Sequence, residues 1–390
     1  MDGNGIRRLS DGANQTGVRA HNERLIMSVI QRHGGMPGSD IAKMTGLSAQ
    51  TVSNILRKLE EEGFLLRGEP KRGRVGKPSI PMAIDPDGAI SFGLKIGRRS
   101  ADLAMMNMHG DVLERKQATY RYPMPAAIFA FLSEGIDTFS ATLTEHQSSR
   151  LCGIGIAAPS DIWSWADVLG APEEFTIWRE TDFEREIARF SDLPLFTEND
   201  TTAACQAEHI FGRGRTFSDY AYFFIGSFIG GGVVLRSSVV EGGQRNAGAF
   251  GSLRVTDRQG RESALIDAAS LYLLETSITE LGLDPTLMWH MPQDWTAFES
   301  VLGTWIDNSA AAIAHASRSV CSVMDFEAVL IDGAFPPDVR ARLVQKTREE
   351  MDRLDMRGLI APRIEEASVG VDARVRGAAC APIYAQYFFK

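Results

Sequence analysis

The stretch Ser39-Asp-Ile-Ala-Lys-Met-Thr-Gly-Leu-Ser-Ala-Gln-Thr-Val-Ser-Asn-Ile-Leu-Arg-Lys-Leu59 predicts two helices joined by a tight turn. Gly46 lies at the turn, where a residue without Cβ adopts the required backbone conformation without strain. Ser48 is placed to cap the second helix, because its side-chain oxygen accepts a hydrogen bond from a backbone N–H one turn on. Apolar residues at helical spacing then predict a buried face formed by Val52, Ile55, Leu56 and Leu59.

The opposite face of the second helix carries short hydroxyl and amide side chains, the kinds that contact base edges in the major groove: Gln50, Thr51, Ser53 and Asn54. Arg57 and Lys58 follow, where DNA phosphates would lie. We interpret the stretch as a helix-turn-helix with its recognition helix. An αα-hairpin in an ordinary helical domain shares the glycine turn and the apolar spacing. The flanking sequence favours the DNA-binding interpretation.

Those flanks predict an amphipathic helix at 19–33 and two short strands at 63–67 and 80–84, around a basic loop broken by Gly and Pro. The loop cations suit phosphate contacts or a narrow minor groove, unless the loop is only a charged linker; they are Arg72, Arg74 and Lys77. The sequence therefore predicts a disordered lead at 1–18 and a winged helix-turn-helix domain at 19–85.

The charge of the chain is unevenly distributed along its 390 residues. The net charge is −9, but residues 1–80 hold 13 of the 41 basic and 8 of the 50 acidic side chains, leaving 28 basic and 42 acidic beyond them. An acidic chain with a basic N-terminal part remains compatible with nucleic-acid binding. Double-stranded operator DNA is therefore the expected partner of that part.

The four cysteines, Cys152, Cys205, Cys321 and Cys380, form no close pair, which argues against a disulfide framework or a Cys-x-x-Cys zinc site. The start of the chain lacks the apolar segment of a signal peptide, and no apolar run approaches the ~18 residues of a transmembrane helix. We expect a cytoplasmic protein without membrane contact, associated with the nucleoid when bound to DNA.

Beyond the turn at 85–88 the pattern changes to strands, and one arrangement occurs twice. Three strand-like runs at 89–96, 100–108 and 112–120 include a glycine-containing turn, and the segments 220–236 and 238–241 repeat this order. We also predict helices at 178–190 and over 263–281. A duplicated βββαβαβα lobe predicts a two-lobed α/β domain of the actin/hexokinase-like (ribonuclease H-like) type over 86–390. Such domains bind nucleotide phosphates on two glycine turns that face each other across a cleft.

Four motifs resemble the ROK family (repressors, open reading frames, sugar kinases), and the resemblance extends over 19–390. They are Gly153-Ile-Gly-Ile-Ala-Ala-Pro159, Glu198-Asn-Asp200, the loop 225–232, and Ala247-Gly-Ala-Phe-Gly-Ser252. The resemblance implies a sugar site at Asn199 and Asp200. It also implies a winged helix domain, which the family's repressors carry and its kinases lack.

Several positions depart from the kinases of that family. Lys95-Ile-Gly-Arg-Arg99 stands where the kinases have Asp-x-Gly-Gly-Thr, Phe228 replaces a phosphate-loop glycine, and Asp332-Gly-Ala334 weakens a nucleotide-contacting Gly-Gly. Phosphoryl transfer depends almost entirely on positioning and charge stabilisation. We therefore predict no catalytic residues and no ATP cofactor. Whether the Lys95–Arg99 hairpin has become an anion site is left open.

The zinc site of the family also lacks its ligands, because Ser252 replaces a histidine and 257–262 contains no cysteine. We predict neither a metal nor another cofactor. Ala249 replaces a sugar-binding glutamate. The remaining candidates for a sugar-like effector are Asn199, Asp200, Arg245 and Asn246, although the first two would also serve simply as a helix cap.

The sequence as a whole predicts a DNA-binding transcriptional regulator, a repressor of carbohydrate-related genes, with a catalytically inactive sugar-kinase-like domain. We expect a sugar or sugar derivative as effector, and a homodimer or homotetramer that places two recognition helices on one operator. Two alternatives remain: an ATP-dependent sugar kinase with a DNA-binding appendage, and a DNA-binding dimer that responds to no ligand.

Overall fold

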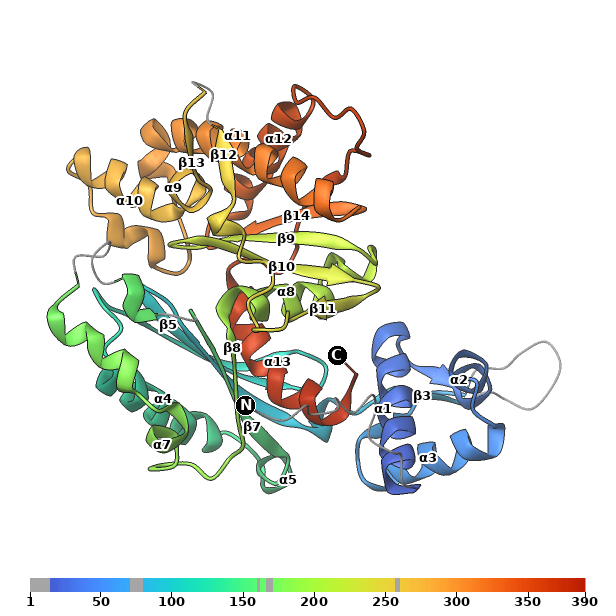
Figure 1. Cartoon of the computed structure of the whole chain (residues 1–390). Coiled ribbons are helices and arrows are strands. Elements are labelled where there is room, and N and C mark those ends of the chain that lie inside the picture. Colours follow the sequence, from blue (N-terminus) through green and yellow to red (C-terminus); the bar gives the residue numbers. More distant parts are fainter. Residues whose placement is uncertain (1–14, 71–79, 160–161, 166–170, 257–259, 390) are drawn as a thin grey trace, which may run out of the picture. The chain divides into compact units, whose positions relative to one another are not determined.

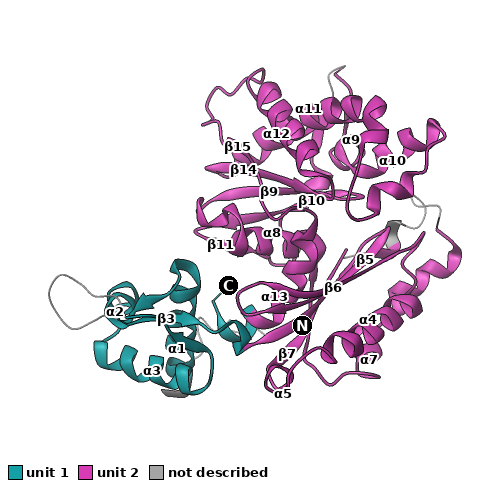
Figure 2. Ribbon diagram, turned by 180° about the vertical axis from the view of Figure 1, so that it is seen from behind, with its two compact units in different colours: residues 1–88, 384–390 teal, residues 89–383 magenta. Residues whose placement is uncertain are grey.

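The computed structural model describes residues 15–70, 80–159, 162–165, 171–256 and 260–389. The chain divides into two compact units, one formed by residues 1–88 with 384–390 and the other by residues 89–383 (Figure 2). No helix among the described residues is both long enough and apolar enough to span a bilayer.

The first unit has the helix and strand order of a winged helix (Figure 1). Its elements are α1 (Gln15–His33), β1 (Met36–Pro37), α2 (Gly38–Thr45), α3 (Ala49–Glu61), β2 (Leu65–Arg67), β3 (Pro81–Ile84) and η1 (Pro86–Gly88). The three strands form an antiparallel sheet of order β1-β3-β2. The helix α1 begins at Gln15, inside the segment predicted as a disordered lead, because an established helix extends at little cost per added residue. Residues 1–14 lie outside the described part.

The turn between α2 and α3 forms as predicted. Gly46 adopts the left-handed conformation with φ of 70°, and its N–H donates to the carbonyl of Ala42. Ser48 caps α3, because its hydroxyl accepts from the N–H of Thr51 at 3.1 Å. The predicted inner face of α3 is buried at all four positions, Val52, Ile55, Leu56 and Leu59.

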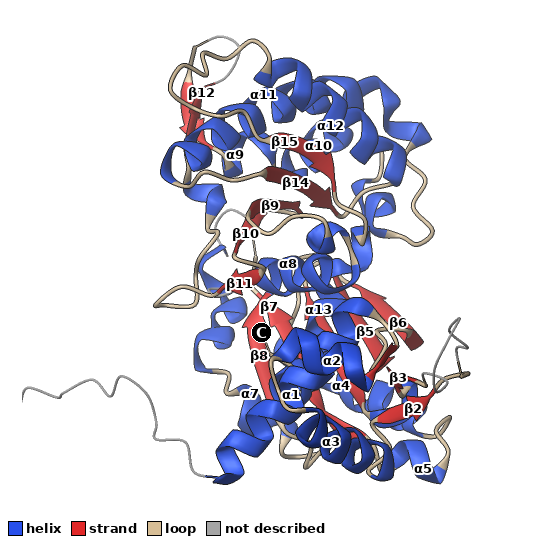
Figure 3. Ribbon diagram, turned by 90° about the vertical axis from the view of Figure 1, so that its right-hand side faces the viewer, coloured by secondary structure: helices blue, strands red, loops and turns tan. Residues whose placement is uncertain are grey.

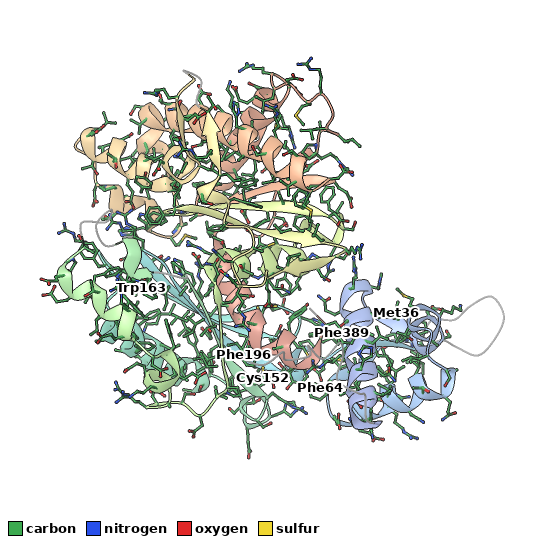
Figure 4. All side chains as sticks on the ribbon, viewed as in Figure 1. Met36, Phe64, Cys152, Trp163, Phe196 and Phe389 are labelled. Atoms are coloured by element: carbon green, nitrogen blue, oxygen red, sulfur yellow. The ribbon has the colours of Figure 1, made fainter. Side chains whose placement is uncertain are left out.

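Residues 384–390 group with the first unit, whereas the sequence placed all of 86–390 in one domain. The reason is aromatic packing: the ring of Tyr387 lies 5.0 Å from that of Phe64, and the ring of Phe389 lies 4.8 Å from that of His21. The N–H of Phe389 also donates to the hydroxyl of Ser28 at 2.9 Å. Figure 4 labels Phe64 and Phe389 on this unit.

The second unit contains two five-stranded sheets of the same strand order, 3-2-1-4-5 in the order of the chain within each repeat (Figures 1 and 3). In the first sheet the order is β6-β5-β4-β7-β8, with β4 antiparallel to β5 and parallel to β7. In the second it is β11-β10-β9-β14-β15, with β9 antiparallel to β10 and parallel to β14. The predicted duplication is therefore confirmed.

The elements of the first repeat are β4 (Ile90–Ile96), β5 (Ser100–Asn107), β6 (Val112–Thr119), α4 (Pro125–Ser140), α5 (Glu145–Ser148), β7 (Leu151–Ala158), η2 (Ile162–Trp165), η3 (Glu173–Glu180), α7 (Phe183–Ile187) and β8 (Leu195–Asn199). Those that follow are α8 (Asp200–Phe211), η4 (Arg213–Arg215), β9 (Tyr220–Ile225), β10 (Ile229–Leu235), β11 (Ser238–Val240), η5 (Phe250–Ser252), β12 (Arg254–Thr256), β13 (Glu262–Ala264), α9 (Ile266–Ala269), α10 (Leu271–Glu280), η6 (Pro285–Trp289), η7 (Thr296–Phe298), α11 (Glu299–Val323), β14 (Ala328–Gly333), α12 (Pro337–Met351), β15 (Arg363–Glu366), η8 (Gly370–Asp372) and α13 (Ala373–Tyr387).

Helices α8 and α13 lie between the two sheets (Figure 1). Glycines make this close packing possible. A Cβ on Gly93 of β4 would lie 2.2 Å from the backbone nitrogen of Ala379, and one on Gly377 of α13 would lie 1.9 Å from the carbonyl oxygen of Ala203 in α8. Ser91 adds a hydrogen bond from its hydroxyl to the carbonyl of Ala379. The backbone of α13 thus packs directly on the first sheet.

Two predicted helices are interrupted. The expected helix at 178–190 is instead η3 followed by α7, because Asp182 is extended and caps a new helix by accepting from the N–H of Arg185. The expected helix at 263–281 is split into β13, α9 and α10. Ser270 separates the two helices in an extended conformation, and its hydroxyl accepts from the N–H of Ile229 at 3.0 Å.

Candidate functional site

The outer face of α3 presents the predicted base-contacting side chains. Gln50, Ser53 and Asn54 are exposed and Thr51 is half-buried. The amide of Gln50 donates to the side-chain oxygen of Asn54 at 3.0 Å, one helical turn along. The hydroxyl of Thr51 lies 2.9 Å from that of Ser48, so it also belongs to the helix cap. Gln50 and Asn54 therefore form one polar strip on the free side of the helix.

The two cations at the end of α3 differ in their surroundings. Arg57 is exposed, and its Nε lies 3.9 Å from Glu61. The Lys58 ammonium instead donates to Glu23 of α1 at 2.7 Å and lies 3.6 Å from Glu62. Arg57 is thus the better placed of the two for phosphate. The loop residues Arg72, Arg74 and Lys77 lie outside the described part, so their prediction stays a prediction.

The second unit contains a cavity of about 550 Å³, lined from both repeats. Its lining includes the β4–β5 turn (Gly97, Arg98), the start of α8 (Asn199–Thr201), the β9–β10 turn with the first residues of β10 (227–230), the 246–252 loop, and Arg374 of α13. Such a volume suits one small molecule.

Three of the four predicted effector residues, Asn199, Asp200 and Asn246, line this cavity. Asn199 also caps α8, because its side-chain oxygen accepts from the N–H groups of Thr201 and Thr202. Asp200 is buried, and its carboxylate accepts from Nη1 of Arg374 at 3.2 Å.

The fourth predicted residue, Arg245, is absent from the described lining. Its backbone is left-handed with φ of 55°, and its side chain is 79% exposed, 4.0 Å from Glu241. Proximity in sequence to Asn246 therefore does not bring Arg245 into the cavity.

A buried ammonium group fills the base of the β4–β5 turn. Nζ of Lys95 donates to the carbonyl and hydroxyl of Ser100 and to the carboxylate of Asp102 at 3.0 Å. Burial lowers the pKa of Lys95 to about 8, against the opposing effect of Asp102. Burial would raise the pKa of Asp102, but the charges of Lys95 and Arg115 outweigh it and hold that pKa at about 2. Both groups are therefore charged at neutral pH.

The β9–β10 turn is occupied by an aromatic ring. Phe228 packs 5.5 Å from the ring of Tyr272, and the guanidinium of Arg98 lies 5.7 Å from the Phe228 ring centre. The β9–β10 turn thus presents a ring to the cavity, and the cation that lies over this ring, Arg98, comes from the β4–β5 turn.

Comparisons with known proteins bear on both units. Residues 19–65 match a winged helix-turn-helix DNA-binding family, and residues 91–264 match the ROK family. The chain carries a ROK family domain. We use the name ROK domain for the second unit, residues 89–383, which contains the matched segment. The predicted resemblance is therefore confirmed, and the winged helix precedes the ROK domain in the sequence.

Relatives of this chain include protein y4fQ of Sinorhizobium fredii, 24% identical over 373 residues, which are 94% of this chain and 92% of y4fQ. The xylose repressor of Bacillus subtilis is 22% identical over 245 residues, which are 63% of this chain and 63% of the repressor. This match therefore covers less than two thirds of the repressor. Among solved structures, a ROK family transcriptional regulator homologous to the E. coli MLC protein aligns with a TM-score of 0.66 and 19% identity, over 95% of this chain and 97% of that one. These matches confirm the predicted fold class.

Two arginines of the ROK domain cavity were not predicted as ligand contacts. Arg98 was considered as an obstacle to phosphate binding and as part of the Lys95–Arg99 hairpin, whose role as an anion site was left open, and Arg374 carried no motif. Arg374 reaches the cavity because α13 begins beside Asp200, although the two residues are 174 positions apart in sequence. The one available signal was the cationic replacement at 95–99.

No group of three or more His, Cys, Asp or Glu side chains suited to a metal ion occurs within the described ranges. Ser252, which is predicted from the sequence to replace a zinc-binding histidine, lines the cavity, and its hydroxyl donates a hydrogen bond to the carbonyl of Ala249. Residues 257–259 of the corresponding cysteine segment lie outside those ranges.

Proposed function

We propose that this chain is a sequence-specific DNA-binding repressor of carbohydrate-related genes, whose ROK domain binds a small effector and catalyses no phosphoryl transfer. The observation that carries the proposal is the free polar strip of Gln50 and Asn54 on a capped recognition helix, with the exposed cation Arg57 beyond it. Amide side chains on such a helix read base edges, and cations beyond them contact phosphate. The names of the xylose repressor and of the MLC-like regulator are consistent with this role.

The β4–β5 turn supports the non-enzymatic part of the proposal. An ATP-dependent kinase needs a cation near the transferred phosphate, held by carboxylates. The carboxylate of Asp102, which follows this turn in β5, is already bound by Lys95, Arg115 and Gln117. Its negative charge is thus neutralised inside the protein and is not available to a metal ion.

A homodimer or homotetramer in the cytoplasm would place two recognition helices on a near-palindromic operator, about one helical turn apart or a multiple of it. The chain offers a covalent connection between the effector cavity and the DNA-binding unit. Arg374 in the first turn of α13 lines the cavity, while residues 384–390, which begin within the last turn of the same helix, belong to the DNA-binding unit. Effector and operator affinities are then coupled reciprocally.

The test is binding of the purified full chain to DNA taken from around its own gene, at two salt concentrations, with and without a panel of sugars and sugar derivatives. We expect specific binding that one compound relieves. Asn54→Ala should weaken binding to the specific site about 10- to 100-fold and leave binding to unrelated DNA unchanged.

Arg57→Ala should weaken binding to all DNA and reduce the salt dependence by about one phosphate contact. Lys116→Ala removes the same charge from β6 of the ROK domain and serves as the matched control, with DNA binding unchanged. Weak binding that is equal for all DNA and collapses with salt would overturn sequence-specific recognition. Sustained ATP turnover with a sugar would overturn the non-enzymatic role, and specific binding that no compound alters would overturn the effector role.

A further inference from the structure

The guanidinium of Arg98, which lines the ROK domain cavity, is buried with most of its hydrogen-bonding capacity unused. Its side chain is 11% exposed, and Nε and Nη1 have no hydrogen-bond partner among the described residues. Its nearest carboxylate oxygen, on Glu275, lies 3.9 Å from Nη2, too far for a hydrogen bond. Unsatisfied donors of a buried cation are costly, so this state favours a ligand that meets them.

The carboxylate of Glu275 is engaged elsewhere. It accepts two hydrogen bonds from Arg99 at 3.2 Å and one from the indole N–H of Trp289 at 2.7 Å. The Glu275 carboxylate therefore lies near two arginines. Of these two, only Arg99, which is absent from the described cavity lining, donates hydrogen bonds to it. Arg98 rests on the Phe228 ring instead, with 5.7 Å between the guanidinium carbon and the ring centre.

A second arginine of the lining repeats this pattern. Arg374 is 7% exposed, donates one hydrogen bond to Asp200, and leaves Nε without a partner among the described residues. Its guanidinium lies 4.8 Å from the ring centre of Phe224. Because Arg374 neutralises Asp200, the lone carboxylate of the described lining adds no net negative charge.

The charge balance of the cavity is therefore positive. The charged side chains of the described lining are Arg98, Asp200, Arg254 and Arg374. The positive charge of Arg98 lies at the β4–β5 turn, while the hydrogen-bonding groups of Asn199, Asp200 and Asn246 come from the start of α8 and the 246–252 loop. The lining thus combines an anion-binding group with acceptors and donors for hydroxyl groups.

We propose that the effector is a single polyhydroxylated molecule carrying one anionic group, a carboxylate or a phosphate monoester, which Arg98 binds while Asp200 and Asn246 contact its hydroxyl groups. This inference rests on the proposed function and names its ligand class. A guanidinium binds a carboxylate or a phosphate through two parallel hydrogen bonds, because both anions present pairs of oxygen atoms to its N–H groups. Phe228 supports the guanidinium from the other side through its ring face.

The experiment compares three groups of compounds on the full chain by thermal shift and titration calorimetry. They are neutral pentoses and hexoses, the sugar acids of the same series, and their sugar phosphates, with inorganic phosphate alone as the minimal probe. We expect a member of one anionic group to raise the melting temperature while its neutral parent does not. Whether the acid or the phosphate binds identifies the source of the anion.

Arg98→Gln should weaken binding of that compound at least about tenfold, as expected for loss of a charge-assisted contact. Arg99→Gln is the matched control: it removes the same charge from the same turn and a contact with the same Glu275, but Arg99 is absent from the described lining, so binding should change less than about threefold. Circular dichroism confirms that both variants are folded.

The outcomes separate this inference from the proposed function. Neutral sugars that bind as tightly as their anionic relatives, or an affinity that Arg98→Gln leaves unchanged, would overturn the anion site and leave the repressor intact. An anionic compound that binds through Arg98 without altering operator binding would support the site and overturn its regulatory role. A panel in which nothing binds, with operator binding unchanged, would overturn both the anion site and the effector role and leave sequence-specific DNA binding standing.

Discussion

The β4–β5 and β9–β10 turns occupy the same place in two sheets of identical strand order, yet they contain opposite chemistry. The first holds Lys95, Arg98 and Arg99; Lys95 donates to Asp102 and Arg99 to Glu275, whereas Arg98 lies 3.9 Å from Glu275 without a hydrogen bond to it. The second holds Gly226, Ser227 and Phe228, with an aromatic ring and no charged side chain. Duplicated topology thus determines where a turn lies, whereas the side chains decide what the turn can bind.

The strands behind the two turns differ in the same way. Strand β9 is buried along its length and rich in aromatic side chains, whereas β4 contains Gly93, on which the backbone of α13 packs. In register with Gly93 on the neighbouring strand β7 lies Gly155, where a Cβ would be 1.8 Å from the carbonyl oxygen of Ala378. The first sheet therefore accepts a helix backbone on a surface without side chains.

The largest expected effect is a loss of stability when the contact between Gly93 and the backbone of α13 is disrupted. Gly93→Val should destabilise the chain by about 4 kcal/mol or more, because the new side chain meets backbone atoms of Ala379 that cannot move away. Urea unfolding followed by circular dichroism measures the loss. Gly303→Ala in α11 is the control: a Cβ there meets nothing within 4 Å, so the variant should gain about 0.5–1 kcal/mol. Equal stability of the two variants would contradict the packing argument.

The next effect concerns the buried charges of the first turn. Asp102→Asn should cost about 3 kcal/mol, because the Lys95 ammonium would remain buried beside a neutral partner. Replacing Lys95 by Met in the same chain should restore part of this loss, as the unpaired charge is then removed. The melting temperatures of both variants test the pair. A double variant less stable than Asp102→Asn alone would show that Lys95 stabilises the turn by some means other than this charge.

The pH dependence of stability sharpens the comparison further. The pKa of Lys95 is about 8 in the folded chain against 10.5 ordinarily, so between these values the unfolded chain binds a proton that the folded chain has released. Stability should therefore rise with pH in this window, by at most about 1.4 kcal/mol per unit. Lys95→Met should lack this contribution. Urea unfolding at three pH values from 8 to 10 compares the two slopes, and parallel curves would refute the expected titration.

The smallest effect tests the ring of the second turn. Phe228→Leu removes the aromatic face beneath Arg98 but keeps an apolar side chain. A cation–ring contact is worth about 0.5–1 kcal/mol, so affinity for an anionic effector should fall about two- to fivefold. Titration calorimetry measures the change. Phe131→Leu is the control: it removes a ring that lies beneath a cation, Lys116, but that ring is absent from the described cavity lining, so affinity should not change. A fall larger than that of Arg98→Gln would contradict a merely supporting role for the ring.

The sequence predicted best those features that local interactions determine. Gly46 and Ser48 lie within a few residues of the groups they serve, so the helix-turn-helix could be recognised with its turn and cap. The repeated strand order was recognisable for a related reason: each repeat carries its own apolar strands and glycine turn. The interruption of the predicted helix over 178–190 at Asp182 is also local. That prediction overlooked Asp182 as a residue that caps a new helix.

Contacts between distant segments could not be predicted in the same way. Nothing near Arg374 indicates that it meets Asp200, and no periodicity links Tyr387 to Phe64. Arg245 shows the converse, because its side chain is 79% exposed and absent from the described lining of a cavity that its neighbour Asn246 lines. The candidate site was thus half predicted: the polar residues came from motifs, and the arginines required the fold.

Assigning residues 384–390 to the same unit as 1–88 affects how the chain matures on the ribosome. The winged helix is synthesised first, but Tyr387 and Phe389, which pack against Phe64 and His21, emerge only after the whole ROK domain. The DNA-binding unit of a nascent chain therefore lacks these aromatic contacts until residues 89–383 have been synthesised. Of the two units, the one that begins the chain is thus the last to receive all of its residues.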